Sequence, residues 1–263
     1  MKLVASESKS GEARDLRVDP AAWQMRVDLA AAHRLAFAQG FSEGIFNHLT
    51  CSVPGKPDRY FQIPFGLHWC EITASSLLEV GFDGKVLSGE GEAERSGFCI
   101  HAPIHQLNPE AVCVMHTHMP FASALSRLED PTIKAIGQTE CGLMRHVVYD
   151  ELYTGPAFDP AEGERLARVL GDKKVMFMAN HGVLTVGKSV AEAYDLLYYL
   201  ERVAQVQLYA MWTGQRLKTL PQSIVEQTMS TIGGPMYGGK PHWEHHFAAL
   251  KRMLDRREPD YRD

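Results

Sequence analysis

Two histidines one residue apart, His116 and His118, end an apolar run in "AVCVMHTHMPFASALS", residues 111–126. In a β-strand, side chains two residues apart point to the same face, so a strand at 111–117 projects both imidazoles side by side. The carboxyl end of such a strand is where open α/β sheets place ligand sites. Neutral imidazoles bind divalent metals, and an ion held this way needs a third ligand. The spacing therefore predicts a metal site.

The expected third ligand is His181 in "MFMANHGVLTVG". This histidine also follows an apolar strand directly, and it precedes Gly182, which lets the backbone turn sharply. The His-x-His pair alone fits two polar residues at a strand end as well as it fits a metal site. A second histidine at a strand end favours the metal.

The elements that position these residues can be read along the chain. Asp19 and Pro20 predict the start of a helix that ends near Gly40, and from residue 44 short β-branched and aromatic runs predict strands with a hairpin at Asp83 and Gly84. Helices and strands then alternate: helix near 98–107, strand at 111–117, helix from 120, strand near 145–149, helix at 160–170, strand "KVMFMA" and helix 189–212. This pattern predicts a layered α/β domain with a mixed sheet.

Composition divides the chain into three parts. Residues 1–18 are predicted to be a mobile tail, and 19–213 to be one domain. Residues 214–240 are rich in Gly, Ser, Thr and Pro, which predicts an extended arm before a short C-terminal helix, "HWEHHFAALKRMLDRR". The part from 214 to 263 is expected to pack on the same domain or on a neighbouring subunit.

Bulk composition excludes several function classes. The 263 residues carry 27 basic and 32 acidic side chains, so nucleic acid is not an expected partner, and a small-molecule substrate is. Five widely spaced cysteines without a Cys-x-x-Cys pair predict reduced thiols of a cytoplasmic protein. Neither an apolar leader nor a segment of membrane-spanning length is apparent, so we expect no secretion and no membrane insertion.

Longer stretches carry a resemblance. "HAPIHQLNPEAVCVMHTHMPFASALS" and "MFMANHGVLTVGKSVAEAYDLLYYLERVAQVQ" resemble the class II aldolase and adducin N-terminal domain family, and "GFSEGIFNHLTCSVPG" and "FQIPFGLHWCEITASSLLEV" fit its early strands. The resemblance implies a three-layer α/β/α sandwich with a central mixed, mainly antiparallel sheet. It also implies a homo-oligomer, commonly a tetramer, with sites near subunit interfaces. The family binds a divalent ion at the positions of His116, His118 and His181, usually Zn²⁺, with Mn²⁺ or Fe²⁺ as alternatives.

The sequence departs from the sugar-phosphate aldolases of this family at their catalytic acid. Counting back from the histidines places that acid at Gly97, and glycine cannot transfer a proton. The adducin-like branch also has a Gly-Phe pair here, so the chain resembles that branch. Arg95 replaces one serine of the aldolases' phosphate pocket, whereas Ser96 remains. Ser96 and Gly97 are candidate substrate-binding positions, and a phosphorylated sugar is not the expected substrate.

Further candidates follow from the resemblance. Gln138 and Glu140 in "GQTECG" stand near the position of a tyrosine that the aldolases send into a neighbouring subunit's site. They are candidate catalytic residues, with Glu140 as general acid or base, although an exposed loop carboxylate is the simpler interpretation. Asn47 aligns with a substrate-contacting asparagine, but it fits equally well as a partner of strand-end backbone groups. Tyr153 is a candidate substrate contact.

Neighbouring polar residues receive structural interpretations. His48 alternates to the face opposite Asn47 and is not expected to be a ligand. His101 and His105 are expected to pack behind the ligands, and Glu71 is expected to belong to a turn ahead of a helix.

The function expected from these observations is a divalent-metal-dependent lyase that performs aldol cleavage or decarboxylation. Its substrate is expected to be a small hydroxy, keto or aromatic carboxylic acid, with the metal stabilising an enediolate-like charge. Two alternatives remain open. One is a non-catalytic, adducin-like assembly protein that retains the histidines by inheritance, and the other is an iron(II)-dependent oxygenase on the same three histidines.

Overall fold

The computed structural model describes residues 19–232 and 239–263, so the tail predicted at 1–18 lies outside the described residues. The helices are α1 (Pro20–Ala38), α2 (Arg95–Leu107), α3 (Pro120–Leu125), α4 (Gln138–Met144), α5 (Pro160–Leu170), α6 (Val190–Trp212), α7 (Gln222–Thr231) and α8 (His242–Arg257). The strands are β1 (His48–Val53), β2 (Lys56–Gln62), β3 (Leu78–Gly81), β4 (Val86–Ser88), β5 (Cys113–Thr117), β6 (Val147–Asp150), β7 (Val175–Met178) and β8 (Val183–Gly187). Among the described residues, Trp69–Glu71 and Pro259–Arg262 form 3₁₀ helices.

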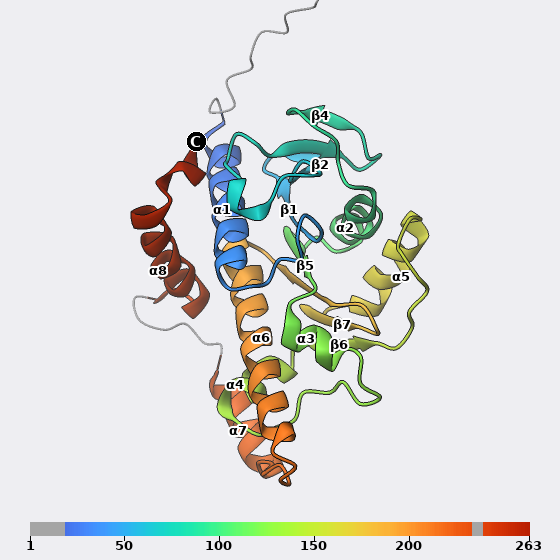
Figure 1. Ribbon diagram of the computed structural model, residues 1–263, viewed down its shortest axis with the longest axis vertical. Helices are drawn as coiled ribbons and strands as arrows, with labels where there is room; N and C mark the ends of the chain where they lie inside the picture. The colour runs from blue at the N-terminus through green and yellow to red at the C-terminus, as the bar shows by residue number, and fades with distance from the viewer. Residues whose placement is uncertain (1–18, 233–238) are drawn as a thin grey trace, which may run out of the picture.

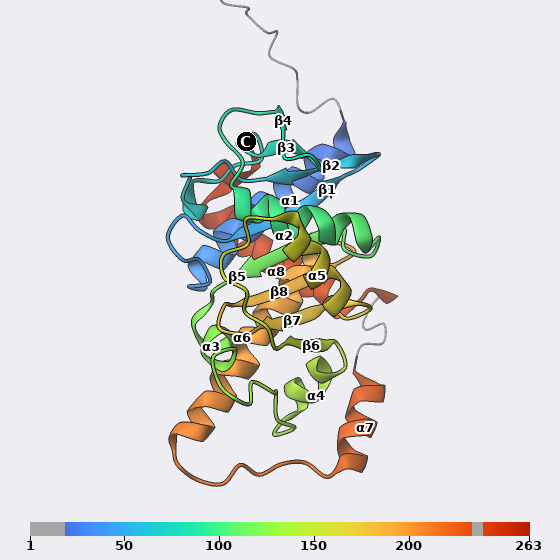
Figure 2. The same ribbon diagram turned by 90° about the vertical axis from the view of Figure 1, so that its right-hand side faces the viewer.

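The strands form one sheet between two layers of helices. Helices α1, α6 and α8 lie on one face, and α2 and α5 lie on the other (Figure 1). The strand order is β4-β3-β2-β1-β5-β8-β7-β6, and Figure 2 shows the strands following one another in this order. All neighbours are antiparallel except β6 and β7. The predicted three-layer sandwich with a mixed, mainly antiparallel sheet is confirmed.

The central strands are buried on both faces because helices cover each side. Every residue of β5 and of β8 is buried. Such strands carry continuous apolar runs instead of alternating polar and apolar residues. The three histidines of interest stand at or just beyond the ends of such strands, because His116 is next to last in β5, His118 follows β5 and His181 precedes β8.

The long helices begin where the sequence predicted. The Asp19 carboxylate accepts hydrogen bonds from the amides of Ala21 and Ala22 and caps α1. The Ser189 hydroxyl accepts from the Glu192 amide and caps α6. These caps satisfy amides that have no partner within the helix. Glu71 has a structural role, because it forms a reciprocal capping box with His68 in a 3₁₀ helix, but strand β3 follows it where a helix was expected.

Three elements were missed. The prediction passed directly from the "KVMFMA" strand to the long helix, but β8 lies between them and is joined to β7 by a tight turn in which Asn180 has a φ of 54°. Helix α4 forms where a loop was expected, and α7 lies inside the expected arm. Both helices are short and pack together, with Gly142 of α4 facing Ile232 (Figure 1). Tertiary packing stabilises them more than local propensity does.

The C-terminal helix α8 has the predicted extent and packs against α1 and α6. His242 and His246 both bond to the buried Asp195 carboxylate of α6, at 2.9 and 2.7 Å. The five cysteines are free. Within the described ranges, no helix is long and apolar enough to cross a membrane.

Candidate metal centre

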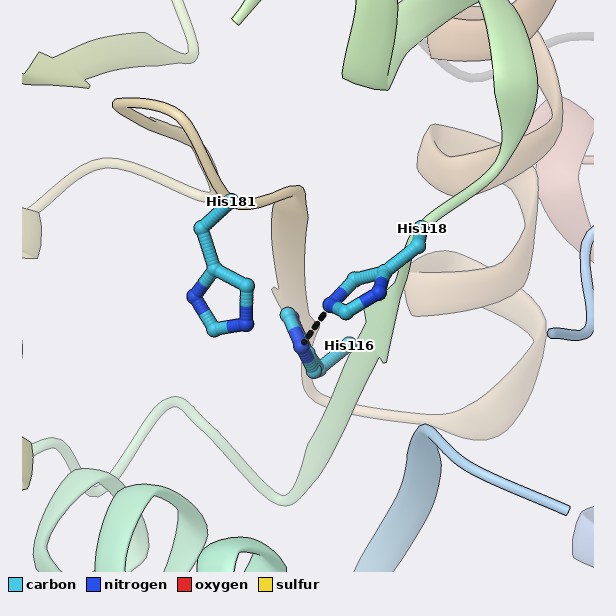
Figure 3. Close-up of side chains that lie close together, drawn as sticks. All are labelled: His116, His118 and His181. Carbon is cyan, nitrogen blue, oxygen red and sulfur yellow. Dashed lines mark hydrogen bonds between the residues drawn. The ribbon is translucent and has the colours of Figure 1, made fainter. Parts of the chain in front are cut away.

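The three predicted histidines converge at one end of the sheet. His116 lies in β5, His118 follows that strand directly, and His181 lies in the turn between β7 and β8 (Figure 3). The end of β5 pairs with the start of β8 through Thr117 and Val183, which brings the turn beside the histidine pair. One ligand nitrogen from each ring lies within 4.8 Å of the others. The sequence prediction that these residues meet is therefore correct in the fold.

Hydrogen bonds fix two of the rings. His116 Nδ1 lies 3.0 Å from the Val183 carbonyl, and His118 Nδ1 lies 2.5 Å from Glu43 Oε2. The Val183 carbonyl accepts from His116 and the Glu43 carboxylate accepts from His118, so in the neutral rings both Nδ1 atoms carry the proton and both Nε2 atoms are bare. Partners of this kind are typical of metal-binding histidines.

The two bare nitrogens face each other. His116 Nε2 and His118 Nε2 are 3.2 Å apart, the contact drawn as a dashed line in Figure 3. Two lone pairs repel at this distance unless a cation lies between them. Zinc with bonds of about 2.0–2.1 Å to a tetrahedral set of nitrogens separates neighbouring ligands by about 3.3 Å. The donor set therefore fits a divalent cation.

The electrostatics of the site keep the ligands neutral. Burial is the largest cause that lowers the pKa of His116, and the neighbouring His181 and His118 lower it further. Burial and then His118 lower the pKa of His181 to about 4. Burial also lowers the pKa of His118, although its bond to Glu43 opposes this effect. Neutral imidazoles can accept a metal ion without first releasing a proton.

Two backbone features hold the ligands in place. Asn47 Oδ1 accepts from the His118 amide at 3.1 Å, and Asn47 itself has a φ of 70°. Of the two interpretations of Asn47, backbone bonding is the one observed. Gly182 touches the other side, because a Cβ there would lie 2.6 Å from the His118 ring and from the Thr117 carbonyl. Only glycine allows this approach.

His48 lies beside the cluster. The pairing of β1 with β5 places it directly across from His116. The two rings stack with centroids 5.5 Å apart. His48 is not a member of the converging group, and its Nδ1 instead contacts His101 Nε2 at 3.3 Å.

A chain of buried polar groups continues behind His48. The Thr50 hydroxyl contacts His101 Nδ1 at 2.7 Å and His105 Nε2 at 2.8 Å, and His105 Nδ1 donates to the Ala111 carbonyl at 2.7 Å. Burial lowers the pKa of His101 well below its ordinary value and that of His105 to about 4. Both rings lie behind the ligands, as the sequence predicted.

Gly97, the position at which the sugar-phosphate aldolases carry their catalytic acid, is tightly packed. A Cβ at Gly97 would lie 2.9 Å from Gln62 Nε2 and 3.0 Å from the His48 ring. A side chain at this position therefore requires the Gln62 amide and the His48 ring to shift.

Glu94 takes the donors of the same segment. Its Oε2 accepts from the Gly97 amide at 2.7 Å and from the Ser96 hydroxyl at 2.6 Å, and it lies 3.2 Å from His48 Nε2. Burial raises the pKa of Glu94, but bonds and charge from His48, Ser96 and Gly97 outweigh it and lower the pKa to about 2. Sequence reasoning missed Glu94, although an acidic residue directly before a helix is a recognisable capping pattern. Ser96 and Gly97 stay predictions as substrate-binding positions.

Gln138 and Glu140 lie at the start of α4. The interpretation of Glu140 as an exposed loop carboxylate was wrong, because it is only 5% exposed and lies in a helix. Both residues line a cavity of about 640 Å³ beside α6, and the described residues of its walls include none of the three histidines. A role in a neighbouring subunit's site stays a prediction.

Tyr153 lies next to the cluster. Its ring centroid is 6.2 Å from that of His181, and the side chain is half exposed. It is placed where a substrate contact was predicted, and that role stays a prediction.

Comparison with known proteins identifies the family. The model of the class II aldolase and adducin N-terminal domain matches residues 27–208. The chain belongs to this family. The resemblance predicted from the sequence motifs is therefore confirmed, and so is the fold that it implied.

Individual members of the class II aldolase and adducin family extend the comparison. An aldolase II superfamily protein from Pseudomonas syringae shares 36% identity with a TM-score of 0.87, and the alignment covers 96% of this chain and all of that one. An L-fuculose 1-phosphate aldolase from Glaciozyma antarctica PI12 shares 25% identity with a TM-score of 0.79, covering 92% of this chain and 93% of that chain. Alpha-adducin of Rattus norvegicus is 32% identical over 244 residues, which are 88% of this chain but 33% of the adducin.

Proposed function

We propose that this protein is a divalent-metal-dependent lyase, an aldolase or decarboxylase that acts on a small hydroxy, keto or aromatic carboxylic acid. The observation that carries the proposal is the convergence of three neutral histidines, two of which direct bare Nε2 atoms toward each other. Polar groups arranged in this way have a favourable energy only around a cation. We propose Zn²⁺ as the native ion, with Mn²⁺ and Fe²⁺ as alternatives.

Different residues of the chain would bind the ion and orient its ligands. His116, His118 and His181 would hold the ion, which when bound polarises a substrate oxygen and stabilises negative charge beside it. Glu43 and the Val183 carbonyl orient two of the rings. These contacts hold the ligands in position before substrate arrives, so little reorganisation accompanies the reaction.

The charge at the start of α2 supports an unphosphorylated substrate. Sugar-phosphate aldolases place phosphate-binding serines in this segment, but here the Ser96 hydroxyl donates a hydrogen bond to the Glu94 carboxylate. Glu94 is ionised at neutral pH because its hydrogen bonds, opposing burial, lower its pKa to about 2. A carboxylate at this place repels a phosphate group, with up to two negative charges, more strongly than it repels a singly charged carboxylic acid. The half-exposed ring of Tyr153 beside His181 suits an acid with an apolar or aromatic side chain.

The proposal includes a homo-oligomer, with a tetramer as the expected state. Gln138 and Glu140 line a large cavity remote from the histidines of their own chain, which supports a role at a subunit boundary. Light scattering of the purified protein measures the number of chains. A strictly monomeric protein with full activity would show that a neighbouring subunit contributes nothing to the site.

Elemental analysis tests the metal. We expect about one divalent ion per chain in protein purified without chelators, loss of that ion in His116→Ala, and retention in His146→Ala as the matched control. The proteins that retain the ion should cleave or decarboxylate unphosphorylated acids, and the variant that loses the ion should not. A wild type that binds no metal on titration contradicts the proposal and favours the non-catalytic assembly protein. Bound iron together with substrate-dependent oxygen consumption favours the oxygenase.

A further inference from the structure

One arginine reaches back toward the histidine cluster. Arg127 follows α3, a short helix that begins at Pro120, two residues after His118. Its Nη1 donates to the Ser123 carbonyl at 2.6 Å and lies 3.5 Å from the Ser126 hydroxyl. The guanidinium therefore folds back along the helix, toward the end at which His118 stands.

The third ligand lies on the same side. The amide of Asn180, the residue before His181, donates to the Ser126 carbonyl at 2.9 Å. This bond joins the end of α3 to the turn that carries His181. Arg127 is thus the next residue after a direct contact with the ligand turn.

Arg127 also lacks an acidic partner. Arg34 and Arg165 pair with carboxylates. The polar contacts of Arg127, by contrast, are with Ser123 and Ser126, and the described residues supply no carboxylate to it. Its side chain is exposed, and among the described residues its Nε and Nη2 atoms have no hydrogen-bond acceptor. A guanidinium presents paired donors that match a carboxylate in geometry and in charge.

We infer that Arg127 binds the carboxylate of the substrate and selects 2-hydroxy or 2-keto acids at the histidine site. In such acids the carboxylate is adjacent to the hydroxyl or keto oxygen. One group can therefore reach Arg127 while the other faces the three histidines. This inference rests on the proposed function, because it needs the histidines to hold an ion.

Ligand binding to the cobalt(II)-loaded protein tests the inference without turnover. Glycolate and its neutral amide, glycolamide, are titrated separately while the visible absorption of the cobalt is followed. Arg127→Gln should weaken glycolate binding by about tenfold or more, the usual loss for hydrogen bonds to a charged group. Arg127→Lys should lose less, and glycolamide binding should be unchanged. Arg168→Gln removes an exposed arginine on α5 and serves as the matched control.

Cobalt affinity distinguishes a failure of the proposed metal site from a failure of the role proposed for Arg127. If all variants bind cobalt as the wild type does, the histidine site is intact and the ligand titrations decide the role of Arg127. Equal losses for glycolate and glycolamide, or no loss for either, would overturn the inference and leave the metal site standing. A wild type that binds no cobalt overturns the proposed function and this inference with it.

Discussion

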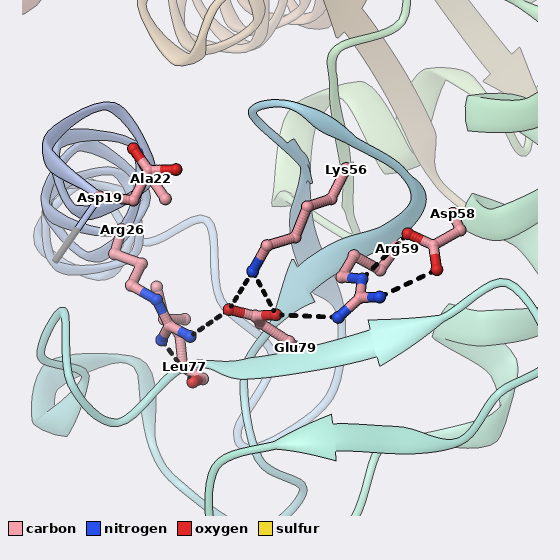
Figure 4. A network of polar contacts seen from close by, with 8 residues as sticks. All are labelled: Asp19, Ala22, Arg26, Lys56, Asp58, Arg59, Leu77 and Glu79. Carbon is pink, nitrogen blue, oxygen red and sulfur yellow. Dashed lines mark hydrogen bonds and ion pairs between the residues drawn. The ribbon is translucent and has the colours of Figure 1, made fainter. Parts of the chain in front are cut away.

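Two buried polar clusters in this molecule are built in opposite ways. At one, the Glu79 carboxylate of β3 lies 3.6 Å from Arg26 Nη2, 3.2 Å from Lys56 Nζ and 3.5 Å from Arg59 Nη1 (Figure 4). At the other, His116, His118 and His181 are neutral bases that face one another. The first cluster joins opposite charges, whereas the second brings together like groups.

The difference separates a structural cluster from a binding site. Arg26 also donates to the Leu77 carbonyl at 2.6 Å, so the Glu79 cluster ties α1 to the strands with partners from the chain itself. The histidine cluster, by contrast, brings acceptor nitrogens together. A buried polar group without a partner costs free energy, so such an arrangement persists where a ligand supplies the partner.

Removing a histidine should give the largest effect. His181→Ala should lower zinc affinity by about a thousandfold, because one of three protein ligands is lost. The free energy of unfolding of the metal-free protein should stay unchanged or rise, since fewer acceptors then face one another. Competition with a chromophoric chelator measures the affinity, and urea unfolding measures the stability. Wild-type affinity in this variant would remove His181 from the ligand set.

Breaking the Glu79 cluster should have the opposite signature. Glu79→Gln leaves the buried Arg26 guanidinium without its counter-charge, which should lower the free energy of unfolding by about 3 kcal/mol. Zinc affinity should remain that of the wild type. Glu164→Gln is the control, because its exposed pair with Arg168 contributes little. Equal stabilities of the Glu79 and Glu164 variants would show that the Glu79 cluster is not structural.

Glu43 should give a smaller effect on the metal alone. Glu43→Gln keeps a hydrogen-bond acceptor near His118 Nδ1 but removes the negative charge. Zinc affinity should fall by about tenfold, the lower end of the usual range for such partners, because the Glu43 side chain is 60% exposed. Isothermal titration of the metal-free protein measures this change. An unaltered affinity would mean that the Val183 carbonyl and the fold orient the rings without Glu43.

The smallest effect concerns α8 and pH. Burial raises the pKa of Asp195, but the bonds from His242 and His246 outweigh it and leave the pKa below its ordinary value. The bond to Asp195 raises the pKa of His242. Asp195 thus contributes stability above pH about 4 that is lost at lower pH, and His242 contributes stability below pH about 6.5 that is lost at higher pH.

The contact between α6 and α8 should therefore be strongest between about pH 4 and 6.5. We expect the wild type to lose about 1 kcal/mol or less from pH 5.5 to 8.5, because His242 is about a third exposed. Asp195→Asn should remove this part of the pH dependence. Urea unfolding at the two pH values gives the comparison. An identical pH dependence in both proteins would show that this pair does not hold α8.

The three histidine ligands could be predicted from the sequence, because the geometry of β-strands alone indicates which side chains share a face and a strand end. His116 and His118 are two residues apart, and His181 has the same place after another strand. The residues that orient them could not, because Glu43 and Val183 come from distant parts of the chain. Only the fold brings these acceptors to the rings.

The same reason explains the misjudged elements. Helix α4 depends on contacts with α6 and α7, and its own residues include a glycine. Strand β8 is short, and only a tight turn separates it from β7. The sequence therefore contains no clear signal of a boundary between the two strands. The burial of Glu140 is likewise a property of packing, and a sequence pattern cannot report it.

The contact between His48 and Gly97 has an evolutionary consequence. A carboxylate introduced at Gly97 alone would collide with the His48 ring, and removing His48 alone would leave a gap beside His116 and deprive Glu94 of a partner. Each single change is therefore expected to be unfavourable. The effect of a substitution at Gly97 is expected to depend on the residue at position 48, so the two positions are expected to change together.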